Sequence, residues 1–486
     1  MEVLIFIPLI LSLVLGIALY FTKANKKVLD CLFVFTTLVS FVITLVVLFS
    51  NSPIRIELFG ITPELKVLFK VDEIGKIFST LFAFIWFVVS IFSVKYMDHE
   101  QNVNKFYAYT LLTLSFMLGL AYSGNLLTMY LVFELVTLSS MPLVMHSKTK
   151  ESKSAALKYL FYSLGGGFFG LIAVVTGMFY STNCGEFVFG GSVLHVSETV
   201  LPFVQISLLC GLVGFGAKAG VFPLQAWLPT AHPVAPSPAS ALLSGLITKA
   251  GVIVIIRLVL YVFGYNFIQG TFVQYVWEVL LLITILLGST LALLQKTFKR
   301  RLAYSSISQL SYVLLGICSL TEVGLYGSIL HVLSHAMIKV GLFLVAGFLI
   351  HQYDIHHVDE MEGLGKKAPI TMWCYTLFSI ALIGVPPTGA FFSKWYLALG
   401  SLNSGLTVFD YLGAVVLLIS AILTAVYLLS ISIKAFFPKE VKEEERKKEP
   451  LLMVIPLIVL VVGVFLVGIF STQIIEGLVS SIWEVL

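Results

Sequence analysis

Long apolar runs dominate this sequence and limit what it can fold into. About fourteen lie along the 486 residues, and most approach the roughly twenty residues that an α-helix needs to cross a bilayer. Hydrophobic residues make up 58% of the chain and charged residues only 12%, whereas soluble domains carry about 25% charged residues. We therefore expect an all-α polytopic membrane protein with about 14 transmembrane helices. The expected spans lie near 2–22, 28–50, 75–95, 107–122, 125–146, 155–180, 201–222, 237–263, 274–295, 301–320, 324–351, 369–400, 408–436 and 451–471.

The basic residues are distributed unevenly between the connections. If the first span begins outside, 20 of the 30 lysines and arginines fall on inner connections and 4 on outer ones. This asymmetry satisfies the positive-inside rule and predicts that both termini lie on the outer face. Lys299, in one of the inner basic clusters, is expected to be accessible only from the inside.

The stretch 214–264 breaks the apolar pattern at its centre. Each of its two flanking apolar segments carries a lysine, Lys218 and Lys249, at a depth where a charge costs roughly 2.5–3.5 kcal/mol on insertion scales. Irregular backbone at membrane depth is tolerated only inside protein or beside a water-filled cavity. The stretch therefore predicts a hydrated, ion-handling site within a helix bundle. Its five prolines are Pro223, Pro229, Pro233, Pro236 and Pro238.

The same broken-helix plan occurs a second time. The sequence AKAGVFPLQAW, with Lys218, has a counterpart in GVPPTGAFFSKWYL, with Lys394. Paired broken helices in two halves of a membrane chain indicate inverted repeats around a transport site. We expect two inverted five-helix repeats, each containing a broken helix. The expected divisions are an N-terminal three-helix segment at 1–105 whose outer loop 51–71 is compatible with a small β-hairpin, a first repeat at 106–265 (spans 4–8), a second repeat at 266–436 (spans 9–13), and an inner charged loop with the last span at 437–486.

Glu134 is the one clear acid deep within a span. It lies about nine residues into the fifth span, and no basic residue stands three or four positions away on that helix. An acid at this depth is functional by default, the alternative being a structural hydrogen bond to a serine or threonine. Lys218, near the first break, is its natural partner, unless that lysine reaches to the inner surface instead. A lysine whose carboxylate partner approaches and retreats is a switchable proton carrier.

Further basic residues follow in later spans. Lys249 lies mid-span between Gly245 and Gly251, and such small neighbours let water or another helix come close. Arg257, eight residues further on, is expected to extend to the outer surface. Lys394 lies in the outer half of the twelfth span.

His331, His335 and Lys339 form a row on the eleventh span. Their i, i+4, i+8 spacing places them on one helix face over about 12 Å of axis. A proton relay is the favoured interpretation. Packing histidines and ligands of a haem or metal are the alternatives, but no opposing histidine completes a four-helix haem site.

Two residues are secondary candidates, and the cysteines suggest no site. Lys158, early in the sixth span, either joins the path or extends to the inner surface, and His232 lies in the proline-rich stretch. The five cysteines are scattered, without CxxC or metal-ligand spacing. We expect no metal or other cofactor in this chain.

With these residues assembled, the chain resembles the antiporter-like subunits of respiratory complex I and the D-type subunit of Mrp multi-subunit sodium/proton antiporters. The same module occurs in energy-converting membrane-bound hydrogenases and sulfur reductases. The resemblance covers spans four to thirteen. It rests on Glu134 and on the motifs AKAGVFPLQAWLPTAHPVAPSPASALLSG, ITKAGVIVIIR, HVLSHAMIKVGLFLVAG and GVPPTGAFFSKWYL.

The resemblance implies a role for each matched residue. Glu134 would pair with Lys218, Lys249 would link them across the centre, and Lys394 would lead outward. The histidine row with Lys339 would continue the path between them. Some paralogues have a glutamate where this chain has Lys394, which changes the sign of the last carrier. The implied protein is a non-redox, proton-translocating subunit in the cell (inner) membrane, whose partners are other membrane subunits, including related antiporter-like ones, and not nucleic acid.

Two other functions remain open from the residues. A stand-alone sodium/proton antiporter would bind sodium directly, and the broken helices offer carbonyl oxygens for it. Only one acid is clearly deep, however, so sodium, if it moves, is expected to bind a partner subunit. A quinone-reactive or haem-containing redox subunit is disfavoured by the single histidine row.

Overall fold

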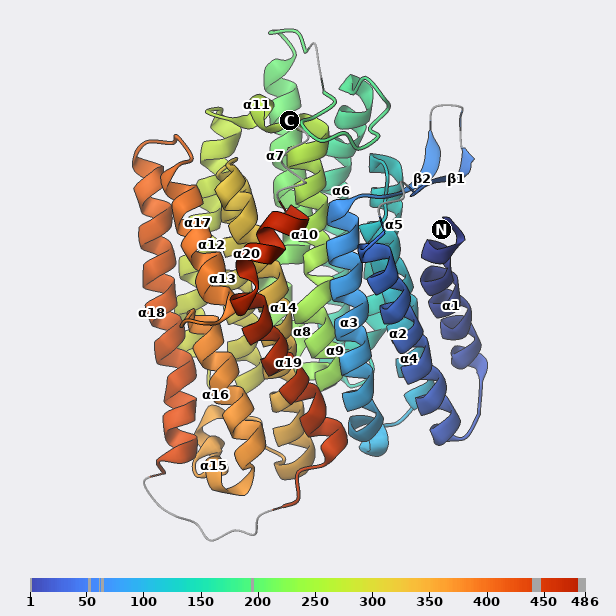
Figure 1. The fold of residues 1–486 in the computed structure, drawn as a ribbon, viewed down its shortest axis with the longest axis vertical. Helices are drawn as coiled ribbons and strands as arrows, with labels where there is room; N and C mark the ends of the chain where they lie inside the picture. The colour runs from blue at the N-terminus through green and yellow to red at the C-terminus, as the bar shows by residue number, and fades with distance from the viewer. Residues whose placement is uncertain are drawn as a thin grey trace.

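The computed structural model describes residues 2–50, 54–60, 62, 65–193, 196–438 and 447–479 as a bundle of long helices with one small hairpin (Figure 1). The helices are α1 Glu2–Phe21, α2 Lys26–Leu48, α3 Glu73–Tyr96, α4 Val103–Ala121, α5 Leu126–Val144, α6 Lys150–Tyr180, α7 Leu201–Ala219, α8 Leu228–Val234, α9 Ser237–Leu242, α10 Lys249–Ile256, α11 Tyr265–Ile268, α12 Phe272–Leu294, α13 Phe298–Cys318, α14 Glu322–Tyr353, α15 Leu364–Lys367, α16 Pro369–Ile383, α17 Gly389–Leu402, α18 Val408–Phe436, α19 Leu451–Ile469 and α20 Ser471–Ile474. Three π-helical segments (Leu243–Ile247, Arg257–Phe263, Ile475–Val479) and three short 3₁₀ turns (Met97–His99, Gln225–Trp227, Val358–Met361) complete the helical elements, and the strands are β1 Ile54–Gly60 and β2 Lys66–Val71.

The predicted all-α membrane class is confirmed. In the described part of the chain, eleven helices are long and apolar enough to cross a bilayer. The expected fourth, tenth and twelfth spans correspond to α4, α13 and the pair α16–α17. The last pair is short because the helix is broken between its two halves. The total of fourteen spans stays a prediction.

A β-hairpin is present in the loop between the second and third spans. β1 pairs antiparallel with β2, and Lys66 Nζ lies 2.9 Å from Glu57 Oε2 across the two strands. The hairpin also bonds to the bundle, because Lys70 N–H donates to Tyr122 O at 2.8 Å and Gly124 N–H donates to Leu68 O at 2.9 Å. These bonds fix the hairpin against the start of α5.

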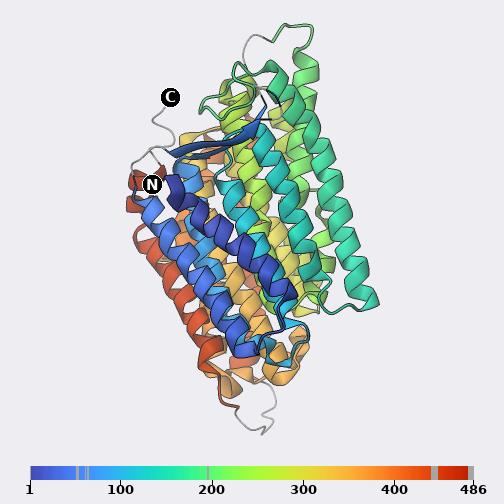
Figure 2. The same ribbon diagram turned by 90° about the vertical axis from the view of Figure 1, so that its right-hand side faces the viewer.

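The two helices that carry most of the predicted site lie inside the bundle. Over the best 18-residue windows, all of the span Ser237–Phe263 and 89% of α14 are buried by protein. Figure 2 shows α1 and α2 on one side of the bundle and α6 on the opposite side, and α19 packs against both α3 and α14. Side chains on these two helices therefore face other helices rather than lipid.

Both predicted helix breaks are present and similar. α7 ends at Gly220 and α16 ends at Gly384, whose φ angles of 84° and 93° are the left-handed values that favour glycine. In each case the valine that follows donates its N–H back into the last turn, to Gly216 O at 2.9 Å or Ile380 O at 3.3 Å. The glycine-valine pair ends each helix, and a proline prevents its continuation. Pro223 stands two residues after the first valine, and Pro386 directly follows the second.

Lys299 does not lie on an accessible surface, so that expectation is wrong. Only 5% of it is exposed, and its Nζ donates to Ala235 O at 2.8 Å. The start of α13 packs under the α8–α9 connection, where Ala235 offers a free carbonyl. Lys296, three residues earlier, is exposed and replaces Lys299 as the topology probe.

We expect a cysteine at Lys296 to react with a membrane-impermeant thiol reagent only from the inside, and a cysteine at Glu198 only from the outside. The hairpin and α11 lie at one end of the bundle and α15 lies at the other, which agrees with the distribution of basic residues (Figure 1). Both sites are exposed. Labelling of Lys296→Cys from the outer face would overturn the predicted orientation.

Candidate functional site

Lys218 is fully buried at the end of α7 and contacts α5. Its Nζ donates to Phe133 O at 2.9 Å and to Thr137 Oγ1 at 2.6 Å, and it lies 3.6 Å from the centroid of the Phe133 ring. These partners flank Glu134 in sequence. The structure therefore places the predicted lysine against the segment that carries the predicted acid.

Glu134 and Lys218 do not form a closed ion pair in this arrangement. Among the described residues, both carboxylate oxygens of Glu134 are buried without a hydrogen-bond partner. Gly167 of α6 makes room for this carboxylate, since a Cβ at that position would overlap Glu134 Oε1. The lysine is bonded to Phe133 and Thr137, while the acid has no hydrogen-bond partner among the described residues.

Lys249 contacts the histidine row directly. Its Nζ lies 2.8 Å from His335 Nδ1 and donates to Ser244 O at 2.9 Å. Ser244 belongs to the π-helical segment that precedes α10, and such segments occur frequently at functional sites. The wider turn leaves a carbonyl that the lysine uses.

The two histidines of α14 continue the series toward α17. The rings of His331 and His335 are stacked with centroids 5.8 Å apart, and His331 Nδ1 lies 2.8 Å from Ser393 Oγ. In the described residues, neither His331 Nε2 nor His335 Nε2 has a hydrogen-bond partner. The predicted row thus forms one contact series from Lys249 to the residue before Lys394.

The remaining two lysines each bond to backbone carbonyls of a neighbouring helix segment. Lys339 is fully buried and bonds to Leu302 O at 3.1 Å and to Ser305 Oγ. Lys394 is half-buried and caps the end of α16. Its Nζ donates to the carbonyls of Leu382 at 2.6 Å and Ile383 at 2.9 Å, at the negative end of the helix dipole.

The secondary candidates differ from each other. Lys158 is partly exposed, and its Nζ lies 5.9 Å from the Tyr162 ring centroid, so it is not part of the buried series. His232 is fully buried against Phe343, with ring centroids 4.7 Å apart. Neither of its ring nitrogens has a hydrogen-bond partner among the described residues.

Arg257 does not extend to the outer surface, contrary to the expectation. It is 1% exposed and bonds to Asp72 through both of its terminal nitrogens, one of them at 2.8 Å. The rings of Phe187 and Tyr261 lie 5.0 and 4.6 Å from the guanidinium carbon. Asp72 is 185 residues away from Arg257 in sequence. The sequence therefore gives no signal for this pairing, and Asp72 is recognisable only as an N-cap residue at the start of α3.

Glu278 was missed when Glu134 was taken as the one clear acid. It lies in the second turn of α12 and is only 2% exposed. Glu278 lies only four residues after the expected start of the ninth span at 274, where an acid is compatible with a position at the membrane surface. The signal that was available was a glutamate within a run otherwise free of charges from Phe272 to Leu294.

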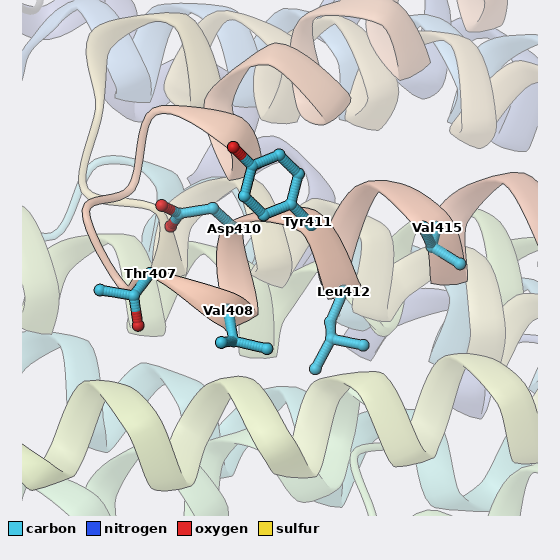
Figure 3. A pocket seen from close by; sticks show the side chains of 6 residues that line it. All are labelled: Thr407, Val408, Asp410, Tyr411, Leu412 and Val415. Atoms are coloured by element: carbon cyan, nitrogen blue, oxygen red, sulfur yellow. The ribbon is translucent and has the colours of Figure 1, made fainter.

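A surface pocket lies apart from this site (Figure 3). It has a volume of 470 Å³ on the outside of α18 and contains none of the buried basic residues. It is lined by Thr407, Val408, Asp410, Tyr411, Leu412 and Val415. Val408 and Leu412 point to one side of the helix, whereas Asp410 points away from them toward the α17–α18 connection.

Comparisons with solved structures show the fold. The chain matches a subunit of the archaeal membrane-bound sulfane sulfur reductase complex with a TM-score of 0.86 at 24% identity, covering 99% of this chain and 96% of that one. It matches a chain of the Mrp complex from Dietzia with a TM-score of 0.87 at 18% identity, covering 100% and 98%.

Sequence comparisons show the family. NADH-quinone oxidoreductase subunit N of Desulforudis audaxviator is 31% identical over 88% of this chain and 87% of that protein. The chloroplast NAD(P)H-quinone oxidoreductase subunit 5 of Arabidopsis thaliana is 32% identical over 89% of this chain, which spans only 59% of that relative. The model of the family "NADH-Ubiquinone oxidoreductase (complex I), chain 5 N-terminus" matches residues 62–107. The model "NADH:quinone oxidoreductase/Mrp antiporter, TM" matches residues 123–424, and the chain therefore belongs to this family of antiporter-like membrane subunits.

Proposed function

We propose that this chain is the proton-translocating subunit of a multi-subunit ion-pumping complex of the complex I, Mrp antiporter or membrane-bound hydrogenase type. The observation that carries the proposal is the buried contact series from Lys249 through His335 and His331 to Ser393. Ser393 directly precedes Lys394, so the series runs from α10 to the second broken helix. Buried titratable groups in contact, with free ring nitrogens, are suited to passing protons from one to the next.

The proposed path begins at the Glu134–Lys218 pair and ends at Lys394. Closing and opening of the pair would change the charge state of Lys218, and Lys249 would take up the proton at the centre. The path groups are Glu134, Lys218, Lys249, His331, His335, Lys339 and Lys394, with His232 as a further buried candidate.

The proposed architecture is two inverted repeats, 106–265 and 266–436. The breaks at Gly220 and Gly384 have the same local backbone geometry, which supports the assignment of two repeats. The path would then lie at the interface of the repeats, where such folds place their transport sites. We propose that the chain lies in the cell membrane with both termini on the outer face.

The proposed partners are other membrane subunits, related antiporter-like ones among them. The solved relatives described above are parts of respiratory and Mrp complexes. In this proposal the chain holds no redox cofactor, so partner subunits or an ion gradient supply the driving force. Moving one charge across 100 mV involves about 2.3 kcal/mol, which sets the energy that each transfer requires.

Direct sodium binding in this chain has less support than proton transfer. A sodium site at the broken helices would need their free carbonyl oxygens. At the second break, Lys394 occupies Leu382 O and Ile383 O. At the first break, Trp227 Nε1 donates to Ala217 O at 2.8 Å. Three of the carbonyls at the two breaks therefore already have partners, which leaves fewer oxygen ligands for a sodium ion.

Replacing His335 with alanine is expected to slow proton uptake into vesicles that contain the purified complex. The substitution removes the ring that joins Lys249 to His331. We expect a loss smaller than the roughly 100-fold that a positioned proton-transfer group contributes, because water bridges part of the gap. The measurement is the uptake rate per intact complex.

A matched control for this experiment is His351→Ala on the same helix. His351 lies at the other end of α14 from the row and contacts the His99 ring, with centroids 4.5 Å apart. This variant is expected to keep the wild-type rate. Unchanged uptake in the His331→Ala/His335→Ala double variant would show that the two histidines serve only in packing.

A further inference from the structure

Glu278 is a buried acid that is not among the groups of the proposed path. It is 2% exposed, and neither a hydrogen bond nor a cation of the described residues acts on its carboxylate. It lies less than two turns from the start of α12, near the bundle end that carries the hairpin. An ionisable group at such a place, without a counter-ion, is a functional candidate by default.

The surroundings of Glu278 are polar and acidic. Its Oε1 lies 3.6 Å from the point where a Cβ on Gly413 would stand, and the same point touches Ser401 Oγ. Ser401 Oγ donates to Asp410 O at 3.0 Å. Asp410, on α18, and the Cys318 thiol, on α13, are the titratable groups of the described residues that interact electrostatically with Glu278. The acid therefore lies near a serine hydroxyl and under the influence of a second acid, and no cation of the described residues acts on it.

Asp410 connects this cluster to the end of the bundle. Its Oδ1 accepts hydrogen bonds from Ser404 Oγ at 2.5 Å and from Leu406 N–H at 2.8 Å. Figure 3 shows its carboxylate pointing toward the α17–α18 connection and away from Val408. Asn403 and Gly405 of that connection are exposed. A proton released from Glu278 on this side therefore has only the α17–α18 connection between it and the surface of the bundle.

Lys394 lies below the cluster on the same side of α17. Ser401 is seven residues further along that helix, which places it on the same face and about 10.5 Å higher. Tyr312 stands between them and α18, with its ring centroid 5.3 Å from Lys394 Nζ and its hydroxyl donating to Leu417 O at 3.4 Å. Tyr312 thus joins the last lysine of the path to α18, the helix that also carries Asp410.

The corresponding end of the first half carries an ion pair in place of an unpaired acid. There, the only cation on the span beyond Lys249 is Arg257, which is held by Asp72 in a buried ion pair. An arginine keeps its proton at any accessible pH, so Arg257 cannot accept and release protons in turn. The unpaired acid near Ser401 predicts proton release at the end of the second half. The arginine paired with Asp72 predicts no release at the end of the first half.

We propose that Glu278 accepts the proton that leaves Lys394 and releases it at the α17–α18 connection. This inference rests on the proposed function. In the step, an N–H bond of the Lys394 ammonium breaks, the proton crosses intervening water, and an O–H bond forms on the Glu278 carboxylate. The proton then passes to bulk water beside Asp410, which restores the Glu278 carboxylate. Lys394 is left as a neutral amine and regains its proton from the path through the histidine row.

Glu278→Gln tests this in vesicles that contain the intact complex. The variant is expected to lower the proton-uptake rate about tenfold or more, because it cannot bind and release a proton. Glu278→Asp is expected to keep part of the wild-type rate. The control is Glu198→Gln, which changes an exposed acid at the same end of the bundle and is expected to keep the full rate. A wild-type rate in Glu278→Gln overturns the inference. Loss in both Glu278 variants would be expected of a steric role and equally overturns it.

The wild-type complex offers a second readout that needs no variant to fold. Dicyclohexylcarbodiimide modifies protonated carboxyl groups in apolar surroundings, and mass spectrometry locates the product. Glu278 is expected to be modified, and an alkaline outer medium is expected to protect it. Absence of modification, or modification that does not depend on the outer pH, overturns the inference.

The failure of this inference differs from a failure of the proposed function. If Glu134→Gln stops uptake and Glu278→Gln does not, the path stands and only its last step is wrong. If neither substitution changes uptake, the proposed function itself fails.

Discussion

Replacing Glu134 with glutamine or Lys218 with methionine is expected to abolish proton uptake while leaving the complex assembled. Each substitution leaves the other partner buried alone, where its neutral form is favoured. Neither variant then holds a site that alternates between charged states. Breaking a buried pair costs roughly 3–5 kcal/mol if the remaining charge stays uncompensated, and a change of protonation reduces that cost.

The geometry of Lys218 adds a reason why assembly survives. Its Nζ already bonds to Phe133 O and Thr137 Oγ1, so the lysine keeps polar partners when Glu134 is replaced. The carboxylate of Glu134 makes no bond that the fold would lose. Uptake per intact complex therefore separates transport from folding.

Lys218→Arg distinguishes switching from scaffolding. Arginine keeps its proton at any accessible pH, so this variant should fail as completely as Lys218→Met. A structural ion pair predicts the reverse, with arginine tolerated and the neutral variants poorly assembled. Lys153→Met, at an exposed lysine near the start of α6, is the matched control and should keep full activity. Full activity in Lys218→Arg would leave Glu134 and Lys218 as scaffolding.

Local sequence signals predicted the features that depend on neighbours in the chain. The breaks after α7 and α16 follow from Gly220 and Gly384 with the prolines beyond them. The histidine row follows from helical spacing alone, and the structure keeps His331 and His335 in stacked contact. In both cases the residues that decide the geometry lie within one or two turns of each other.

Pairings across the bundle were not predictable in this way. The partner of Arg257 is Asp72, and five spans separate the two residues in sequence. A long side chain near a span end is therefore expected to extend outward. Lys299 was misplaced for the same reason, because the carbonyl that binds it belongs to Ala235. The facing of Lys218 and Glu134 was predicted, but their separated state depends on Thr137, whose hydroxyl offers the lysine another partner.

Asp72→Asn is expected to destabilise the protein by roughly 3–5 kcal/mol, the usual cost of leaving one charge of a buried pair uncompensated. Arg257 is 1% exposed and cannot lose its proton, so, unlike Lys218, it has no neutral form to adopt. The rings of Phe187 and Tyr261 compensate only part of the charge. Thermal unfolding of the purified complex measures the loss. The double variant Asp72→Asn/Arg257→Leu should recover much of it, whereas Glu57→Gln, at the exposed hairpin pair, should change little.

The same pair predicts how stability depends on pH. Burial alone would raise the pKa of Asp72, but the charge and hydrogen bonds of Arg257 and the Gly75 N–H outweigh burial and hold this pKa below its usual range. A carboxyl group whose pKa is lowered in the folded state stabilises fully above its unfolded pKa of about 3.9. That contribution is lost as the pH falls through the lower, folded value. The wild-type protein should therefore lose more stability than Asp72→Asn between neutral and strongly acidic pH. Equal acid sensitivity of the two proteins would show that the Asp72–Arg257 pair does not stabilise the fold.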